Sequence, residues 1–192
     1  MTDPTVERAA GTVLELLPEI NEIGDGRLRA AVTRIWTSAW ESSVWDDLAN
    51  VPKSPELPPK RTLTTHTRAV TRIATHMADV ESDMHGLIID RDRVAVIALL
   101  HDVSKLLEFS SGGVGATPSR TGRLYQHGFL GAHWMLEAGL DEGLVHGVIA
   151  HTPCSAVVPQ TQEAVIVHYA DFVDSDVQLL DAGLTLFCKR RR

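Results

Sequence analysis

The sequence predicts an all-α protein, and three observations carry this prediction. Apolar residues recur at intervals of three and four through most of the chain, which is the period of an amphipathic helix. No alternating run of apolar and polar residues is long enough to require a sheet. Stretches rich in proline or glycine separate the helical segments. We therefore expect a bundle of helices that forms one domain, or one domain with a helical appendage.

Two helices are predicted in the N-terminal part, at residues 6–17 and 27–48. The second carries a stripe of tryptophans, which at helical spacing indicates a core or dimer contact rather than a base-stacking surface. The stretch NVPKSPELPP at 50–59 holds four prolines, which break helices and remove backbone donors. We therefore expect residues 1–59 to form a helical extension and a proline-rich junction.

Five more helices are predicted within residues 60–182, and their ends carry typical signals. Asp92, Asp141 and Thr161 are expected N-caps, while Gly139 and Pro153 are expected stop signals. The predicted helices span residues 64–80, 92–109, 126–138, 141–151 and 161–180.

Two segments of this region are not expected to be helical. The segment SSGGVGATPSRTGR at 110–123 has the composition of a mobile loop. It lacks the Gly-Lys-Ser/Thr ending of a phosphate-binding P-loop, which excludes a nucleoside triphosphatase of that kind. Residues 183–192 form a short basic tail, to which we assign no function.

Composition narrows the class of protein further. The formal net charge is −7, so bulk binding to nucleic acid or to anionic membranes is not expected. Cys154 and Cys188 are too few for a disulfide-rich scaffold or a cysteine-based zinc cluster, and a reducing cytoplasm fits best. No stretch approaches the ~20 apolar residues that a membrane span needs, so we expect a soluble protein.

Histidines and aspartates at separate predicted helices are the candidate functional residues. Taken singly, each histidine is better explained as a surface or polar core residue, but the joint pattern favours a metal site. Imidazole and carboxylate together suit zinc, iron, manganese and similar divalent ions. The candidates are His66, His101, Asp102, His127, His151 and Asp171.

Lys105 accompanies this set, because it lies four residues after His101 in the stretch ALLHDVSK. On a continuous helix the two residues would share a face, and the lysine ammonium could neutralise a phosphate. Arg120 and Arg123, in the glycine-rich segment, could close over the same phosphate; ordinary solubility of a loop is the alternative.

The ordered motifs resemble the HD-domain superfamily of metal-dependent phosphohydrolases. The resemblance covers about residues 64–180, through the HD pair, QHGFLGAHWM, VIAHT and EAVIVHYADFVD. It implies a helical bundle with the metal site at its centre. The surroundings of the histidines are most similar to small bacterial members that split diadenosine tetraphosphate symmetrically, usually with iron.

Residue by residue, the resemblance implies a metal site with one or two ions. His66, His101, Asp102 and Asp171 match the basic quartet, and two more histidines, His127 and His151, match members with a dinuclear centre in which Asp102 bridges the ions. Iron and manganese are the first expectations, with zinc, nickel, cobalt or magnesium also compatible.

The remaining histidines are expected to lie outside the site. On a helix His133 and His146 point away from the ligand faces, while His76 and His85 are expected at the surface. His168 is the open case, because it lies three residues before Asp171 and could support a ligand or serve as one.

Three functions remain open from the sequence. The first is hydrolysis of a phosphoester or phosphoanhydride, often a nucleotide, by a metal-activated hydroxide, with Asp102 and Lys105 as catalytic residues. The second is a diiron oxygenase of the same superfamily. The third is a non-catalytic nucleotide sensor that uses the N-terminal helices as a partner or homodimer surface.

Overall fold

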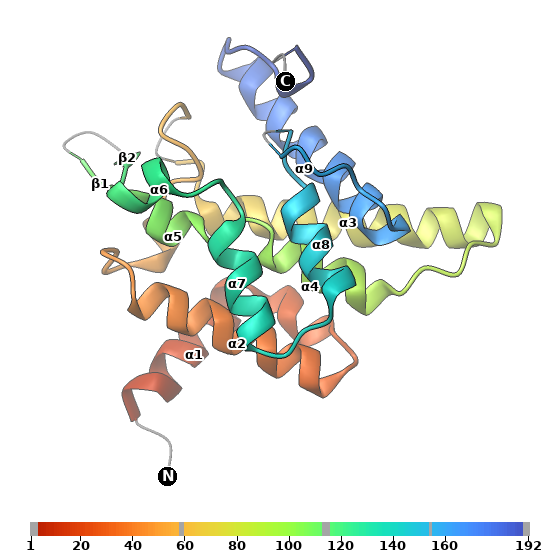
Figure 1. Cartoon of the computed structure of the whole chain (residues 1–192), viewed down its shortest axis with the longest axis horizontal. Helices are drawn as coiled ribbons and strands as arrows, with labels where there is room; N and C mark the ends of the chain where they lie inside the picture. The colour runs from red at the N-terminus through yellow and green to blue at the C-terminus, as the bar shows by residue number, and fades with distance from the viewer. Residues whose placement is uncertain (1–3, 58–59, 113–115, 154, 190–192) are drawn as a thin grey trace.

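The computed structural model describes residues 4–57, 60–112, 116–153 and 155–189. These residues form an all-α fold with one short two-stranded sheet, as Figure 1 shows. The α-helices are α1 (Pro4–Leu16), α2 (Gly26–Glu41), α3 (Leu63–His85), α4 (Arg91–Leu100), α5 (Lys105–Glu108), α6 (Arg120–Leu124), α7 (Phe129–Glu137), α8 (Glu142–Ala150) and α9 (Gln162–Asp181). The strands are β1 (Phe109–Ser111) and β2 (Ala116–Pro118), and the 3₁₀ helices are η1 (Pro18–Glu22), η2 (Leu48–Asn50) and η3 (Phe187–Lys189).

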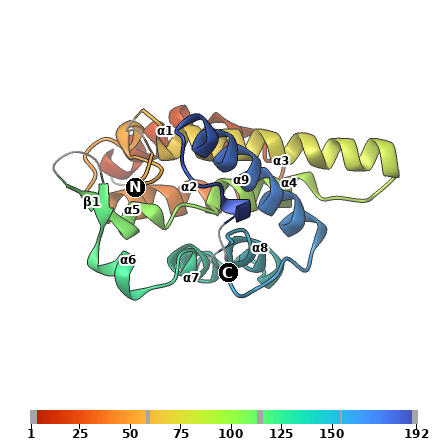
Figure 2. The same cartoon turned by 90° about the horizontal axis from the view of Figure 1, so that it is seen from above.

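Helices α3, α4 and α9 form the centre of the bundle. Helix α3 packs along both α4 and α9, and α4 also contacts α9. Helix α8 packs against α9 and α4, and Figure 2 shows it beside α7. Helices α1 and α2 pack together, and α2 contacts α4. One cluster of buried apolar side chains runs through all these helices, so the N-terminal pair shares the core of the domain.

Helix α4 is buried because its sequence is apolar on every side. Residues 94–100, VAVIALL, are at most 3% exposed, as expected for a helix without a polar face. Helix α4 ends at Leu100, and residues 101–104 form a turn before α5 begins. The predicted continuous helix 92–109 is therefore wrong at this point. The turn delivers the HD pair into the interior of the bundle.

The predicted helix 27–48 ends early, at Glu41. The Ser43 hydroxyl donates to the Trp40 carbonyl and accepts the Trp45 backbone N–H, so it competes with the helical hydrogen bonds. Trp36 lies fully buried in the core, and its indole N–H donates to the carbonyl of Leu99 at 2.8 Å. The interpretation of the tryptophan stripe as core is confirmed for Trp36.

Two of the three predicted caps are confirmed. The side chains of Asp141 and Thr161 accept backbone N–H groups in the first turns of α8 and α9. Asp92 is not a cap, because Asp90 accepts the Arg93 N–H at the start of α4. The Asp92 carboxylate accepts two N–H groups from residues 24 and 25 instead, and so ties the start of α2 to α4.

The segment 110–123 contains regular structure that its composition did not indicate. Strands β1 and β2 pair antiparallel, with Ser110 opposite Thr117, although no alternating apolar pattern indicated a sheet here. Helix α6 follows because the Ser119 hydroxyl accepts the Gly122 N–H and donates to the Leu107 carbonyl. Residues 113–115 lie outside the described residues, and mobility of the segment stays a prediction.

The end of the described chain packs back on α9. The backbone N–H of Phe187 donates to the Asp176 carboxylate at 2.6 Å. Cys188 is an exposed free thiol, and Cys154 lies outside the described residues. Among the helices of the described part of the chain, none combines the length and the apolar content that crossing a bilayer requires.

Candidate metal centre

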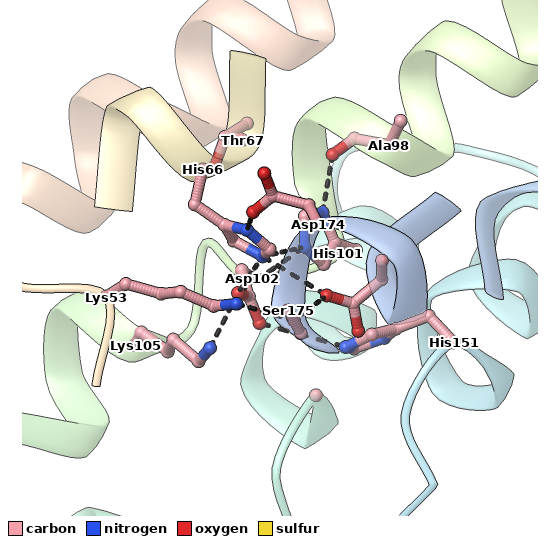
Figure 3. Close-up of polar contacts among 12 residues, drawn as sticks. Lys53, His66, Thr67, Ala98, His101, Asp102, Lys105, His151, Asp174 and Ser175 are labelled. Atoms are coloured by element: carbon pink, nitrogen blue, oxygen red, sulfur yellow. Dashed lines mark hydrogen bonds and ion pairs between the residues drawn. The ribbon is translucent and has the colours of Figure 1, made fainter. Parts of the chain in front are cut away.

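Six side chains predicted as ligands meet in the interior, although they come from five places in the chain. His66 lies in the first turn of α3, where the Thr62 hydroxyl caps the helix by accepting the Thr65 N–H. The other five occupy the turn after α4, the segment before α7, the end of α8 and the middle of α9: His101, Asp102, His127, His151 and Asp171. Figure 3 shows His66, His101 and His151 directed toward Asp102.

Asp102 lies between two pairs of histidines. Its Oδ2 is 3.1 Å from His66 Nε2 and 3.4 Å from His101 Nε2. Its Oδ1 is 3.0 Å from His127 Nε2 and 3.7 Å from His151 Nε2. The two ligand groups, His66–His101–Asp102 and Asp102–His127–His151, thus share one carboxylate. We call them group 1 and group 2.

Asp171 belongs with group 1. Its Oδ1 lies 3.2 Å from His66 Nε2, and its side chain is only 7% exposed. The same oxygen accepts a hydrogen bond of 3.0 Å from the Ser175 hydroxyl, one turn later on α9. This bond fixes the rotation of the Asp171 carboxylate.

Each of the four histidines is held at Nδ1 by a group that can only accept a hydrogen bond. A carbonyl or an ionised carboxylate at this position requires the proton on Nδ1, which leaves the Nε2 lone pair directed into the cluster. The acceptors are Asp174 Oδ2 for His66 (2.6 Å), Ala98 O for His101 (2.6 Å), Glu108 Oε2 for His127 (2.7 Å) and Val148 O for His151 (2.5 Å).

This arrangement calls for a cation. His66 Nε2 and His101 Nε2 are 3.1 Å apart, and with Nδ1 protonated on both rings their lone pairs would repel each other. A proton or a metal ion between them removes the repulsion. Ligand atoms ~2.1 Å from one ion and at right angles lie about 3 Å from each other. The spacing in group 1 and the imidazole and carboxylate donors therefore fit a divalent metal ion.

The pKa values of the side chains agree with a cation at this position. Burial and the nearby Lys53 ammonium lower the pKa of His66, but hydrogen bonds to aspartates 102, 171 and 174 raise it to about 9. Burial also lowers the pKa of His127, and hydrogen bonds to Asp102 and Glu108 raise it to about 9. The surroundings of these two rings thus favour a positive charge, whether a proton or a metal ion carries it.

The carboxylates are held ionised. Burial raises the pKa of Asp102, but the charges of Lys105 and His101 bring it well below its usual range. Burial likewise raises the pKa of Asp171, and the hydrogen bond and charge of His66 lower it well below that range. By contrast, burial lowers the pKa of His151, which favours its neutral, metal-binding form.

Lys105 reaches the cluster, but not by the predicted helical spacing, because residues 101–104 form a turn. Its ammonium donates to Asp102 Oδ2 at 2.6 Å. Burial lowers the pKa of Lys105, while the charge of Asp102 raises it further, so the ammonium stays charged. The side chains of Lys105 and His127 are 14% and 21% exposed, whereas the other ligand candidates are at most 7% exposed. Solvent therefore approaches the cluster from this side.

The two loop arginines are not brought to the ligands. Both are exposed on α6, and Arg123 donates to the carbonyl of Pro118. Their contact with a substrate stays a prediction.

The other histidines lie away from the cluster. His76 is exposed, and His85 and His133 lie at the surface near glutamates, with Nε2 3.9 Å from Glu81 and 3.5 Å from Glu137. His146 Nε2 accepts the Gln160 N–H. His168 is buried against Phe172 and directs Nδ1 to the Ala150 carbonyl.

Four residues of the site were missed from the sequence: Glu108, Asp174, Ser175 and Lys53. Asp174 and Ser175 lie three and four residues after Asp171, so helical spacing could have found them. Glu108 closes α5, but nothing local connects it with His127. Lys53 lies in the proline-rich junction, and no pattern there indicated a buried cation.

The chain is similar in sequence to known proteins. The chain is 32% identical over 113 residues to a dihydroneopterin 2',3'-cyclic phosphate phosphodiesterase of Methanocaldococcus jannaschii. The match covers 58% of this chain and 45% of that relative, so the chain spans less than half of the relative's length. No solved structure matches the chain. The family model of the HD domain matches residues 63–176, more than half of the chain, and all six ligand candidates fall within it. The chain therefore belongs to the HD domain family.

Proposed function

We propose that the protein is a phosphohydrolase that binds two divalent metal ions at groups 1 and 2. The observation that carries the proposal is the position of Asp102, whose two oxygens face separate pairs of histidine nitrogens. A carboxylate placed in this way can bridge two ions. Asp171 supplies a further ligand to group 1, where its Oδ1 lies beside His66.

The chemistry of hydrolysis divides between the ions and the chain. Bound divalent ions would supply Lewis acidity, which lowers the pKa of water and stabilises charge on a phosphate oxygen. The chain holds the six ligands with their lone pairs directed inward and keeps the carboxylates ionised. Lys105, on the more exposed side of Asp102, would bind the phosphate as a point charge.

The substrate class is a phosphoester of small size. The relative from M. jannaschii acts on a cyclic phosphodiester, which supports a phosphodiester bond as the reacting group. A nucleotide substrate, diadenosine tetraphosphate included, is a narrower expectation that needs direct assay. Formation of a homodimer is likewise a prediction.

The number of bound ions tests the metal centre directly. Elemental analysis of anaerobically purified protein should give about two ions per chain, and His127→Ala and His151→Ala should lose the ion of group 2. His133→Ala is the matched control, because His133 also contacts a glutamate but lies at the surface. A parent protein that holds a single ion, with the same content in both group 2 variants, contradicts the dinuclear proposal.

Activity is tested with a panel of cyclic nucleotides, mononucleotides and dinucleoside polyphosphates, with iron and with manganese. We expect phosphate or nucleotide release under anaerobic conditions, and loss of turnover in folded His101→Ala. Oxygen uptake with an organic substrate would instead identify a diiron oxygenase. Tight nucleotide binding without turnover of any compound would identify a sensor.

A further inference from the structure

We propose that Lys53 is a second phosphate-binding lysine of this site, which the N-terminal junction supplies and which acts together with Lys105 on the same anionic group. The inference rests on the proposed function, because it takes the substrate to be a phosphoester. Lys53 precedes residues 63–176, the part of the chain that the HD domain model matches.

The backbone around Lys53 is fixed against the start of α3. Lys53 N–H donates to the Arg61 carbonyl at 2.9 Å, and Leu63 N–H donates to the Val51 carbonyl at 2.7 Å. Pro52 and Thr62 form an antiparallel bridge between these two bonds. The junction therefore doubles back beside the helix that carries His66 and directs one side chain inward.

The side chain of Lys53 ends inside the cluster. The residue is 2% exposed, and its ammonium donates to Ser175 Oγ at 2.5 Å. Figure 3 shows Lys53 and Lys105 extending toward Asp102 from the same side. Two ammonium groups thus lie on one side of the carboxylate that the two ligand groups share.

The partner of Lys53 differs from that of Lys105. Lys105 donates directly to a carboxylate, whereas the acceptor of Lys53 among the described residues is a neutral hydroxyl. The proton of that hydroxyl is already directed to Asp171. An ammonium has three N–H donors, which a single hydroxyl does not use up. Burial lowers the pKa of Lys53, although the charges of aspartates 171, 102 and 174 raise it, so a further anion would favour the charged form. Lys53 therefore keeps capacity for an anion that the chain itself does not fill.

The charge of the cluster points in the same direction. With neutral histidines, as metal binding requires, one divalent ion balances the ionised side chains of the site. A second ion leaves an excess of two positive charges, which favours an anionic phosphate group: a phosphodiester carries about −1, and a phosphomonoester −1.5 to −2, at neutral pH. The side chains counted are the carboxylates Asp102, Asp171, Asp174 and Glu108 and the ammonium groups Lys53 and Lys105.

Calorimetric titration of the manganese-loaded protein with inorganic phosphate tests the inference without turnover. We expect Lys53→Met to bind phosphate about tenfold to hundredfold more weakly than the parent, the usual range for a hydrogen bond to a charged group. Manganese affinity should not fall, because the substitution removes a positive charge. Lys60→Met, which changes an exposed lysine directly after the junction, should leave both affinities unchanged.

Two other roles for Lys53 predict different results, and either would overturn the inference. If Lys53 only holds Ser175 and Asp171 in place, manganese affinity falls and Ser175→Ala reproduces the loss. If Lys53 only balances the carboxylates, manganese binds more tightly and phosphate affinity is unchanged. Lys53→Gln provides a second variant of similar length should Lys53→Met fail to fold.

The proposed function can fail separately. A parent protein that neither binds phosphate nor hydrolyses any phosphoester removes both the function and the inference. Equal phosphate affinities of the parent and Lys53→Met would contradict only the role of Lys53 and leave the proposed function standing.

Discussion

Replacing Glu108 with glutamine should weaken the binding of one metal ion and spare the other. Glu108 Oε2 lies 2.7 Å from His127 Nδ1, and no other ligand candidate is held by this carboxylate in the described part of the chain. His127 belongs to group 2. The substitution keeps the length of the side chain and removes its charge, so it changes the support of His127 without opening a cavity.

The size of the effect follows from the kind of hydrogen bond that is lost. A bond to a charged group contributes about 1.5–3 kcal/mol, and a neutral bond about 0.5–1.5 kcal/mol. Glutamine can still offer a neutral acceptor, so the loss is about 1–1.5 kcal/mol, or roughly tenfold in affinity. Glu108→Ala removes the acceptor altogether, and the loss should approach about a hundredfold.

A competition titration against a chelator, at fixed pH, resolves the two affinities. Glu137→Gln is the matched control, because Glu137 contacts His133 in the same way but at the surface. Its metal binding should equal that of the parent. Equal weakening of both ions in Glu108→Gln, or no weakening of either, would refute the reasoning that ties Glu108 to group 2 alone.

Two further predictions concern stability and proton linkage. Gly147→Ala should lose about 1–3 kcal/mol of unfolding free energy in denaturant titration, because its Cβ would lie 2.6 Å from the Ile97 side chain. Gly11→Ala has open space around it and should not lose stability. Equal unfolding free energies for the two variants would contradict the packing argument. The pKa of about 9 at His66 and His127 means that their stabilising effect in the metal-free protein is complete below about pH 6.5 and is lost as the pH rises through 9. Metal binding should therefore release protons at pH 7, and metal affinity should rise up to pH 9. Calorimetry in two buffers of different ionisation enthalpy measures the number of protons released. Binding without proton release would disprove this linkage.

Several features of the fold could be predicted because their causes are local. The apolar run at 94–100 indicates a buried helix, and these residues are buried in the structure. Asp141 and Thr161 cap helices through bonds that span two or three residues. The meeting of the six ligand candidates was expected from the resemblance, and the geometry agrees with it.

Other features depend on contacts between distant parts of the chain, and the sequence pattern does not contain them. Asp92 is a residue type that often caps helices, but its carboxylate accepts hydrogen bonds from a loop 67 and 68 residues away. Lys53 becomes part of the site only because the junction folds back on α3. Glu108 reaches His127 across a segment of 19 residues. Helical periodicity within a single window cannot report such pairs.

The hydrogen bond between Trp36 and Leu99 has a consequence for how the family motif is used in different proteins. The Leu99 carbonyl lies two residues before His101, and a side chain 63 residues away satisfies it. The α-helical hydrogen bonds can therefore end at this point, because the Leu99 carbonyl needs no partner from the following turn. A homologue without such a donor must satisfy the same carbonyl with water or with another segment, or keep the helix one turn longer. Homologues with tryptophan at position 36 should therefore also have the turn after α4. The N-terminal helix α2, which carries this tryptophan, would then limit how the positions of His101 and Asp102 can change between homologues.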